Sequence, residues 1–402
     1  MQKQVSIGDI LDKYGDRYIS RNHITGQQKG LIHLLSACRT NGLGSHFEVC
    51  DQCRYQVKAY DSCRNRHCPT CQQKDKLEWQ DKRMKELLPL GYYHLVFTLP
   101  HELNLLCLQN KKVMYGLLFK AASQTVIELA KDPEHLGGDV GLITVLHTWG
   151  QNMMEHPHLH CIMPSGGLSR DKQHWVHPRK KNKFFVHVKV LSRIFRGKYL
   201  DLLKKSCANA ELSFSGKLSA IKGPRQFEGF LSQLYKKEWV VNIQAPMGKP
   251  GKILEYLSRY VFRIAITDRR IIEVKNGKVL LWWKDYRTNR FCKMWLEIDE
   301  FIRRFLLHVL PKGFFKVRYY GIFASRYRKQ NMETAKAILE QEAADLNEEK
   351  LEDGLQVWEK TNTVWAEIHE AIVNYKKPNC PQCGKGRLHF AGRVYNDPNP
   401  PG

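Results

Sequence analysis

The stretch His156-Pro157-His158-Leu159-His160 decides how the middle of this 402-residue chain folds. It runs on into further apolar residues, as a buried strand does. In a strand, residues i and i+2 point to one face and the residue between them points to the other. His158 and His160 can therefore bind one divalent metal ion together, while Leu159 faces a core.

A third ligand is needed to complete such a metal site. We expect it to be Gln151, with Glu155 and His147 as alternatives in the same region. Imidazoles with an amide or water suit Mg²⁺ or Mn²⁺. The HxH pattern also occurs in zinc hydrolases of small molecules, although here no Asp-His follows it. The simplest alternative is that both histidines only pack inside a strand.

Two tyrosines lie about a hundred residues later, in a segment (252–264) with a helical pattern of apolar residues. Tyr256 and Tyr260 are four residues apart and so share a helix face. Arg259 and Arg263 lie on the same side. Because tyrosine is amphipathic, such a pair is often found in ordinary packing at a core boundary. Beside a metal, however, paired phenols predict nucleophiles that attack a phosphodiester.

The cysteines predict structural zinc. Cys50-x2-Cys53 and Cys68-x2-Cys71 are two CxxC pairs close enough to close one tetrahedral Zn²⁺ site. We expect these four thiolates to hold one ion that supplies folding energy to a short segment. Nothing in the pattern points to a catalytic role for this zinc.

Spacing alone leaves other cysteine assignments open. Cys63 lies between the two pairs and Cys38 before them, so a set with Cys63 or a second zinc is an alternative. Near the C-terminus, Cys380-x2-Cys383 is half of a zinc site. This pair either completes a site elsewhere in the fold or binds nothing.

The charge of the chain favours a polyanionic partner. The formal net charge is +24, yet residues 333–370 hold eleven acidic and three basic side chains, so the rest of the chain is more basic still. Nucleic acid is the commonest partner of such a protein. Basic residues interleaved with aromatic ones suit single-stranded DNA, where rings stack on bases and cations follow the backbone. The expected DNA contacts are Arg64, Arg66, Arg259, Arg263, Lys180, Lys181 and Arg318.

The sequence has no apolar run long enough to span a membrane and no secretory signal at its start. We therefore expect a cytoplasmic, nucleoid-associated protein whose cysteines stay reduced, which favours metal ligation over disulfides.

Local signals predict several elements. Ser6 is expected to cap a first helix, a second helix is expected to begin near Thr25, and Asn276-Gly277 is expected to form a hairpin turn. Strands and helices do not alternate regularly, which favours an α+β fold with an antiparallel sheet. We expect a helical zinc-binding domain at 1–89, a catalytic domain at 90–330, and an acidic helical segment with a CxxC tail at 331–402.

The order of these motifs resembles the two-tyrosine branch of the HUH single-strand nucleases, and within it the rolling-circle insertion-sequence transposases. The resemblance covers roughly residues 25–330. The segments that carry it are Ser62–Cys71, Phe97-Thr98-Leu99-Pro100, the HxH strand, the tyrosine pair and Arg318-Tyr319-Tyr320-Gly321.

The resemblance implies a ferredoxin-like or RRM-like palm with the metal on its sheet and the tyrosine helix beside it. It also implies a bacterial enzyme that nicks single-stranded or hairpin DNA at the ends of its element and transfers one strand through a 5′-phosphotyrosine. Host replication or helicase proteins are potential partners.

Two further hypotheses are compatible with the motifs. A plasmid or phage replication initiator or relaxase would use the same chemistry on a replicon. A zinc-dependent DNA-binding regulator would bind DNA without cutting it. The target sequence, the oligomeric state and the order in which the tyrosines act do not follow from the residues.

Overall fold

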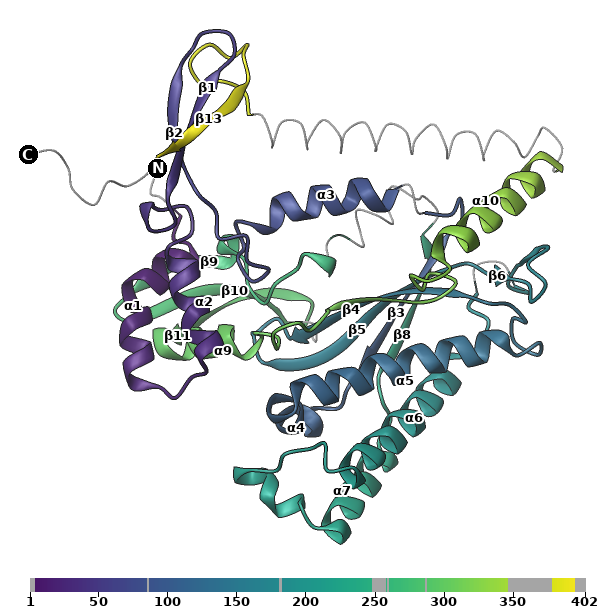
Figure 1. Ribbon diagram of the computed structural model, residues 1–402. Helices are drawn as coiled ribbons and strands as arrows, with labels where there is room; N and C mark the ends of the chain where they lie inside the picture. The colour runs from purple at the N-terminus through teal and green to yellow at the C-terminus, as the bar shows by residue number, and fades with distance from the viewer. Residues whose placement is uncertain are drawn as a thin grey trace, which may run out of the picture.

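A computed structural model describes residues 4–84, 87–180, 183–247, 258, 260–285, 288–345 and 378–394 (Figure 1). Three of the expected site residues, Tyr256, Arg259 and Lys181, lie outside the described residues, as does most of the expected acidic helical segment. Within the described residues, no helix is both long and apolar enough to cross a membrane.

The centre of the molecule is a five-stranded antiparallel sheet in the order β12-β4-β5-β3-β8. Its strands are β3 (Tyr92–Thr98), β4 (Gly141–Trp149), β5 (Glu155–Pro164), β8 (Val241–Met247) and β12 (Val317–Gly321). β5 is inserted between β3 and β4, and it is antiparallel to both. Without β12, the connectivity is β-α-β-β-α-β, as in ferredoxin-like folds.

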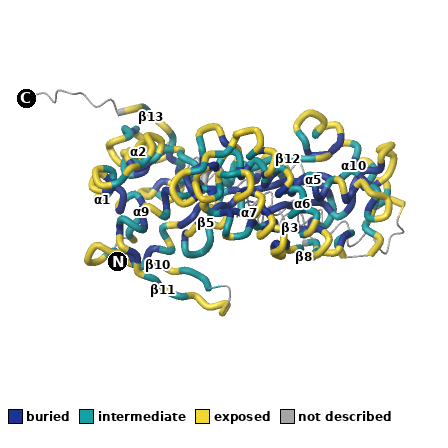
Figure 2. The backbone as a smooth tube through the Cα atoms, turned by 90° about the horizontal axis from the view of Figure 1, so that it is seen from below, coloured by how far each residue is buried: buried dark blue, intermediate teal, exposed yellow. Residues whose placement is uncertain are grey.

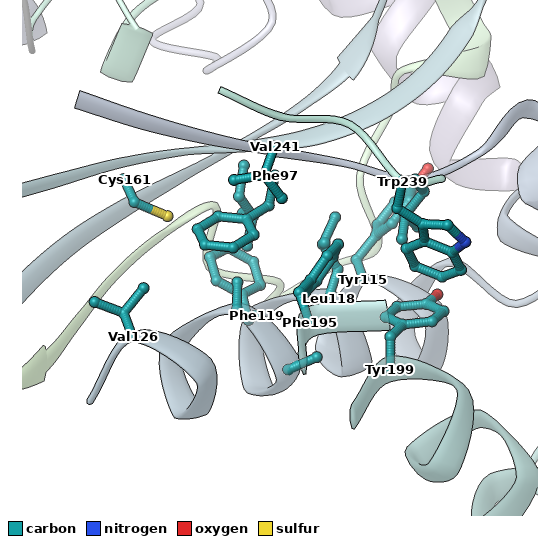
Figure 3. Packing of buried hydrophobic residues seen from close by; sticks show 14 of the residues in the cluster. Phe97, Tyr115, Leu118, Phe119, Val126, Cys161, Phe195, Tyr199, Trp239 and Val241 are labelled. Atoms are coloured by element: carbon teal, nitrogen blue, oxygen red, sulfur yellow. The ribbon is translucent and has the colours of Figure 1, made fainter. Parts of the chain in front are cut away.

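A layer of helices covers one face of this sheet. It consists of α4 (Asn104–Gln109), α5 (Lys111–Lys131), α6 (Val188–Ala208) and α7 (Pro224–Lys236). Alternate strand residues such as Phe97, Leu159 and Cys161 point into this layer, where they meet aromatic side chains of α5 and α6 (Figure 3). Figure 2 shows buried residues concentrated along β3 and β5. Since the helices cover this face of the sheet, the side chains of His158 and His160, which alternate with Leu159 and Cys161, lie on the opposite face.

A second core joins the start of the chain to a later segment. Helices α1 (Ile7–Arg21) and α2 (Gly26–Ser36) pack with the three-stranded sheet β11-β10-β9 and with α9. The later elements are β9 (Ile271–Lys275), β10 (Lys278–Asp285), β11 (Arg290–Glu297) and α9 (Ile298–Leu307). The first and second of the expected domains thus share apolar contacts, and the boundary between them stays a prediction.

The local predictions are confirmed for three elements. Ser6 and Thr25 each form a capping box at the start of α1 and α2. Asn276 and Gly277 both have positive φ, 51° and 73°, between β9 and β10. This is the backbone that a two-residue hairpin turn requires, and it explains the Asn-Gly pair.

The segment between α2 and the central sheet forms an arm that includes the C-terminal strand. β1 (Ser45–Cys50) is the middle strand of the sheet β13-β1-β2, with β2 (Gln56–Tyr60) on one side and β13 (Leu388–Val394) on the other. Helix α3 (Gln72–Met84) then runs above the central sheet, on the side away from α5 (Figure 1).

The remaining elements are short or peripheral. Helix α10 (Arg328–Asp345) packs with residues of the sheet face that α3 also covers. The others are β6 (Gly167–Leu168) and β7 (Trp175–Val176), with 3-10 turns at Asn41–Leu43, His101–Leu103, Gly216–Ile221 and Asp268–Arg270.

Candidate functional site

Three histidines meet on the face of the sheet opposite the helical layer. His158 and His160 lie on β5, and His147 lies on β4 directly across from His158. One ring nitrogen from each of the three lies within 4.8 Å of the others. His147 is 2% exposed and His160 is 8% exposed. Neighbouring antiparallel strands therefore bring together donors that are eleven residues apart in sequence.

Hydrogen bonds orient these rings. The Nδ1 atom of His158 donates to the carbonyl of His156 at 2.7 Å, which leaves the Nε2 lone pair for a metal. His147 donates from Nε2 to the carbonyl of Tyr260, also at 2.7 Å, which leaves Nδ1. Burial lowers the pKa of His158 to about 4 and holds the pKa of His147 and His160 well below the usual value. Neutral imidazoles are the form that binds metals.

His160 is oriented by a fourth histidine. His94 lies on β3, 2% exposed, and its Nε2 is 2.9 Å from Nδ1 of His160. The other nitrogen of His94 is 3.1 Å from the side-chain oxygen Oε1 of Gln244. The amide oxygen can only accept, so His94 carries its proton on Nδ1 and accepts on Nε2. His160 must then donate from Nδ1, and its Nε2 lone pair is directed to the metal position.

Tyr260 lies over this cluster. The centroid of its ring is 3.9 Å from that of His160 and 5.3 Å from that of His94. Because its own carbonyl accepts from His147, the backbone and the ring of Tyr260 are both tied to the histidines. Of the expected tyrosine pair, this is the member that the structure describes, and it lies beside the candidate metal site.

Helix α3 contacts the part of the tyrosine segment that the structure describes. Gln80 donates to the hydroxyl of Ser258 at 3.0 Å, and both residues are buried. The rings of Trp79 and Phe262 pack edge to face with centroids 6.0 Å apart. The cysteine-rich region therefore continues directly into the helix that positions Tyr260.

Arg263 places positive charge at the edge of the site. It is exposed, and its charge contributes to the lowered pKa of both His158 and His160. It also lines an open groove of about 450 Å³ between α3 and the tyrosine segment. The other lining residues are Pro69, Gln72, Lys76, Ser258, Phe262, Ile264 and Thr267.

The expected third metal ligand, Gln151, stays a prediction. His147, one of the alternatives, groups with His158 and His160, because β4 runs antiparallel to β5 and brings His147 opposite His158. Gln151 lies in the turn after β4, where its carbonyl accepts from Arg270. The alternative, Glu155, faces the helical layer, where Tyr115 donates to it at 2.6 Å. Burial there raises the pKa of Glu155 to about 7.

The expected zinc set is wrong in its pairing. The structure separates the two CxxC pairs. Cys50 and Cys53 lie at one end of the arm, and Cys68 and Cys71 lie at the other end. Cys68 and Cys71 instead lie with Cys38, which precedes β1, and with Cys63, which follows β2. The sulfur of Cys38 is 3.7 Å from that of Cys68, and those of Cys38 and Cys63 are each 3.6 Å from that of Cys71.

The physical reason is the hairpin between the two CxxC pairs. β1 and β2 are extended and antiparallel, so Cys50 lies at the far end of the hairpin. Strand β2 then brings the chain back toward α2 before it reaches Cys63. The sulfur separations at Cys38, Cys63, Cys68 and Cys71 agree with those of a tetrahedral site having Zn–S bonds of about 2.3 Å. Cys50 and Cys53 lie with Cys380 and Cys383.

Comparisons with known proteins agree with this arrangement. A family model described as a putative transposase matches residues 141–331, and a second, described as a transposase zinc-binding domain, matches residues 10–99. The chain is similar to a putative transposase, y4qJ, of Sinorhizobium fredii, with 39% identity over 388 residues that cover 95% of this chain and 94% of that protein. This chain belongs to the IS91/IS801 family of transposases.

A second relative is the transposase of insertion sequence IS801 from Pseudomonas savastanoi pv. phaseolicola, which is 28% identical over 293 residues. That match covers 72% of this chain and 68% of the relative. The resemblance to two-tyrosine rolling-circle transposases is therefore confirmed. No solved structure matches the chain. As a transposase, the protein acts on DNA. Its zinc-binding domain and its cysteine clusters support the presence of structural zinc.

Two of the arginines expected to bind DNA are used inside the transposase. Arg66 donates to the carbonyls of Phe314 and Pro311 at 2.6 and 3.2 Å, and burial lowers its pKa. Arg318 faces the helical layer, where its guanidinium lies 4.1 Å from the ring centroid of Phe119. Both side chains are half-buried and contact other parts of the chain, and their role in binding DNA stays a prediction.

Arg64 and Lys180 are exposed, as DNA contacts require. Lys180 lines a groove of about 540 Å³ along the edge strand β8, together with Phe184, Phe185 and Gln244. Gln244, one of the lining residues, also contacts His94 through its side chain. The role of these residues in binding DNA stays a prediction.

Sequence reasoning missed His94 and undervalued His147. His147 could have been found from the sequence, because it lies within the apolar run of β4. Once β4 and β5 are paired, its side chain points to the same face as that of His158. His94 could not be found in this way, because its relation to His160 depends on the register between β3 and β5.

Replacing His94 with Ala is expected to weaken Mn²⁺ binding by the transposase about 10- to 100-fold, because His160 loses the partner that fixes its tautomer. His94→Gln offers a carbonyl oxygen to the same N–H and should restore most of the affinity. Isothermal titration with Mn²⁺ measures both variants, and thermal unfolding separates a loss of fold from a loss of orientation. Unchanged affinity in His94→Ala would show that His160 needs no such support.

Proposed function

We propose that this transposase nicks single-stranded DNA at the ends of its element by tyrosine attack on a metal-bound phosphate, and then transfers the strand in a rolling-circle reaction. The observation that carries the proposal is the position of Tyr260, whose ring centroid lies 3.9 Å from that of His160, one of a group of three histidines. A phenol beside a triple-imidazole site is a nucleophile placed next to an electrophilic centre. The β-α-β-β-α-β sheet that carries these groups is, in this proposal, an HUH nuclease palm.

The three histidines fit a catalytic divalent cation. Their donor atoms lie within 4.8 Å of one another, and the hydrogen bonds of His158 and His147 direct one lone pair of each ring to the centre. Of the two expected ions, three imidazoles favour Mn²⁺ over Mg²⁺, which prefers oxygen ligands. Such an ion, when bound, acts as a Lewis acid on the scissile phosphate.

The protein supplies the nucleophile and the positive charge. A free phenol has a pKa of about 10, so it attacks poorly at neutral pH unless cations favour the phenolate. Arg263, exposed at the edge of the site, provides such a charge and can also contact the phosphate. We expect Arg259 to act likewise, on its spacing in the sequence.

The chemistry is a transesterification. The phenolic oxygen forms a bond to phosphorus, the bond from phosphorus to the 3′ oxygen breaks, and that oxygen takes up a proton. The products are a 5′-phosphotyrosine and a 3′-hydroxyl. Since one phosphodiester replaces another, the reverse attack can join strands without a nucleotide cofactor. Because Tyr256 lies four residues before Tyr260 in the sequence, we expect two such attacks to follow each other in one site.

Zinc has a structural role in this proposal. A Zn²⁺ ion bound by Cys38, Cys63, Cys68 and Cys71 has four thiolate ligands, which leave no position for substrate. Cys71 immediately precedes α3, and α3 contacts the tyrosine segment through Gln80. This ion therefore supports the helix that positions the nucleophile.

The test is a cleavage assay with labelled single-stranded DNA from both ends of the element. Wild type is expected to form a protein–DNA adduct, stable on a denaturing gel, with Mn²⁺ and not with EDTA. The double variants His158→Ala/His160→Ala and Tyr256→Phe/Tyr260→Phe are expected to form none, although their DNA binding persists. His174→Ala, an exposed histidine outside the site, serves as the control.

Two results would contradict the proposal. Tight DNA binding without an adduct on any strand would indicate a regulator that does not cut. Cleavage that survives in the double tyrosine variant would indicate attack by water.

A further inference from the structure

A second group of four cysteines joins the two ends of the chain. Cys50 is the last residue of β1 and Cys53 follows it, while Cys380 and Cys383 precede β13 near the C-terminus. We propose that these four thiolates bind a second structural Zn²⁺ ion, so that the zinc-binding region is completed by the C-terminal tail. The matched family models end at residues 99 and 331, so neither contains this tail.

The sulfur positions fit a tetrahedral zinc site. The sulfur of Cys50 is 3.8 Å from that of Cys383, and the sulfur of Cys53 is 3.6 Å from that of Cys380. All four sulfurs lie within 4.8 Å of one another. Tetrahedral zinc with Zn–S bonds of about 2.3 Å separates its sulfurs by about 3.8 Å. The four thiols are not paired as disulfides, whose sulfurs lie about 2.0 Å apart.

The backbone around the site is shaped to stabilise thiolates. The amides of Gln52 and Cys53 both donate to the sulfur of Cys50 at 3.4 Å. On the other side, the amide of Gly386 donates to the sulfur of Cys383 at 3.3 Å. Such donors favour the charged form of a sulfur ligand. Each CxxC pair therefore contributes one sulfur that accepts backbone hydrogen bonds.

Gly386 shows how closely the two chain ends approach. A Cβ atom at this position would lie 2.3 Å from the sulfur of Cys50. Only glycine fits at such a distance. The amide of Arg387 donates to the carboxylate of Asp51 at 2.8 Å, and the next residues pair with β1 as the strand β13. Strand pairing and sulfur positions thus agree on one arrangement.

The arm needs the metal because it buries little else. The apolar cluster at this end consists of Cys50, Cys380 and Leu388, with three partly buried neighbours. Two of its three buried members are metal ligands in this proposal. A core of this size cannot offset the entropy of ordering the strands, so the binding energy of the ion must hold the tail.

The test is the zinc content of the full-length protein after dialysis, measured by elemental mass spectrometry. In the His158→Ala/His160→Ala background, where the candidate catalytic site cannot hold zinc, the protein is expected to contain two Zn²⁺ per chain. In the same background, the double variant Cys380→Ser/Cys383→Ser is expected to contain one, as is Cys50→Ser/Cys53→Ser. Combining all four substitutions should still leave one, because both pairs serve the same ion. Cys207→Ser, outside both clusters, is the control and should keep two.

A second measurement distinguishes a lost site from a lost fold. Cobalt replaces zinc in thiolate sites and gives an absorption band for each tetrahedral ion, so the band should fall to half in Cys380→Ser/Cys383→Ser while the helical bands of the far-UV circular dichroism spectrum are kept. One zinc in the background protein, or a tail variant that keeps two, would overturn the proposal. None of these readouts depends on strand cleavage, so they stand apart from the proposed function.

Discussion

Replacing Tyr260 with Phe is expected to reduce formation of the covalent adduct at least ~10³-fold, as loss of a nucleophile does. The centroid of the Tyr260 ring lies 3.9 Å from that of His160, so Phe keeps this packing and removes only the oxygen that would bond to phosphorus. The backbone contact to His147 is also kept, because it uses the carbonyl of residue 260. The measurement is the rate of adduct formation on labelled single-stranded DNA with Mn²⁺.

The comparison with Tyr256→Phe ranks the two tyrosines. Because Tyr260 lies directly beside the candidate metal site, we expect it to make the first attack, and Tyr256→Phe should then keep first-strand cleavage and lose strand transfer. Tyr235→Phe, an exposed tyrosine on α7, controls for loss of a phenol elsewhere. Full adduct formation by Tyr260→Phe would assign the first attack to Tyr256.

Replacing Cys71 with Ser is expected to destabilise the protein by at least about 3 kcal/mol, because a structural zinc site contributes its binding energy to folding. Cys71 is 5% exposed and belongs to the apolar cluster that includes α1, α2 and α9. It also immediately precedes α3, the helix whose Gln80 holds Ser258. Strand cleavage should therefore fall together with stability, although all the histidines are intact.

Chemical denaturation and zinc content measure this effect, and removal of zinc with a chelator should reproduce it in the wild type. The control is Cys292→Ser, a half-exposed cysteine outside both clusters. The C-terminal variant Cys380→Ser/Cys383→Ser should leave cleavage largely unchanged, since α3, which contacts Ser258, follows Cys71 at the other end of the arm. A Cys71→Ser variant that is stable, zinc-free and fully active would show that this site has no structural role.

The position of His147 illustrates where sequence reasoning stopped. Strand parity placed His158 and His160 on one face, because the direction of neighbouring side chains in a strand is a local property. The third histidine depends on which residue of β4 lies opposite β5, and register is decided by the packing of the whole sheet. Gln151 is closer to His158 in the sequence than His147 is, but it lies beyond the end of β4.

The arginines illustrate the same limit. A basic residue next to aromatic ones predicts a surface for nucleic acid, but the half-buried Arg318 also packs on the aromatic ring of Phe119. Arg66 likewise meets carbonyls more than 240 residues away in the chain. Composition cannot distinguish these uses, because the direction of a side chain is set by the element that carries it.

By itself, the sequence determined the local parts of this transposase: the capped helices, the Asn276-Gly277 hairpin, the face shared by His158 and His160, and the family to which the motifs belong. These depend on neighbours within a few residues. Only the tertiary structure decided which cysteines meet, because Cys50 and Cys383 are joined by strand pairing across 333 positions of the chain. Contacts over such distances arise from the packing of whole elements, which no local spacing encodes.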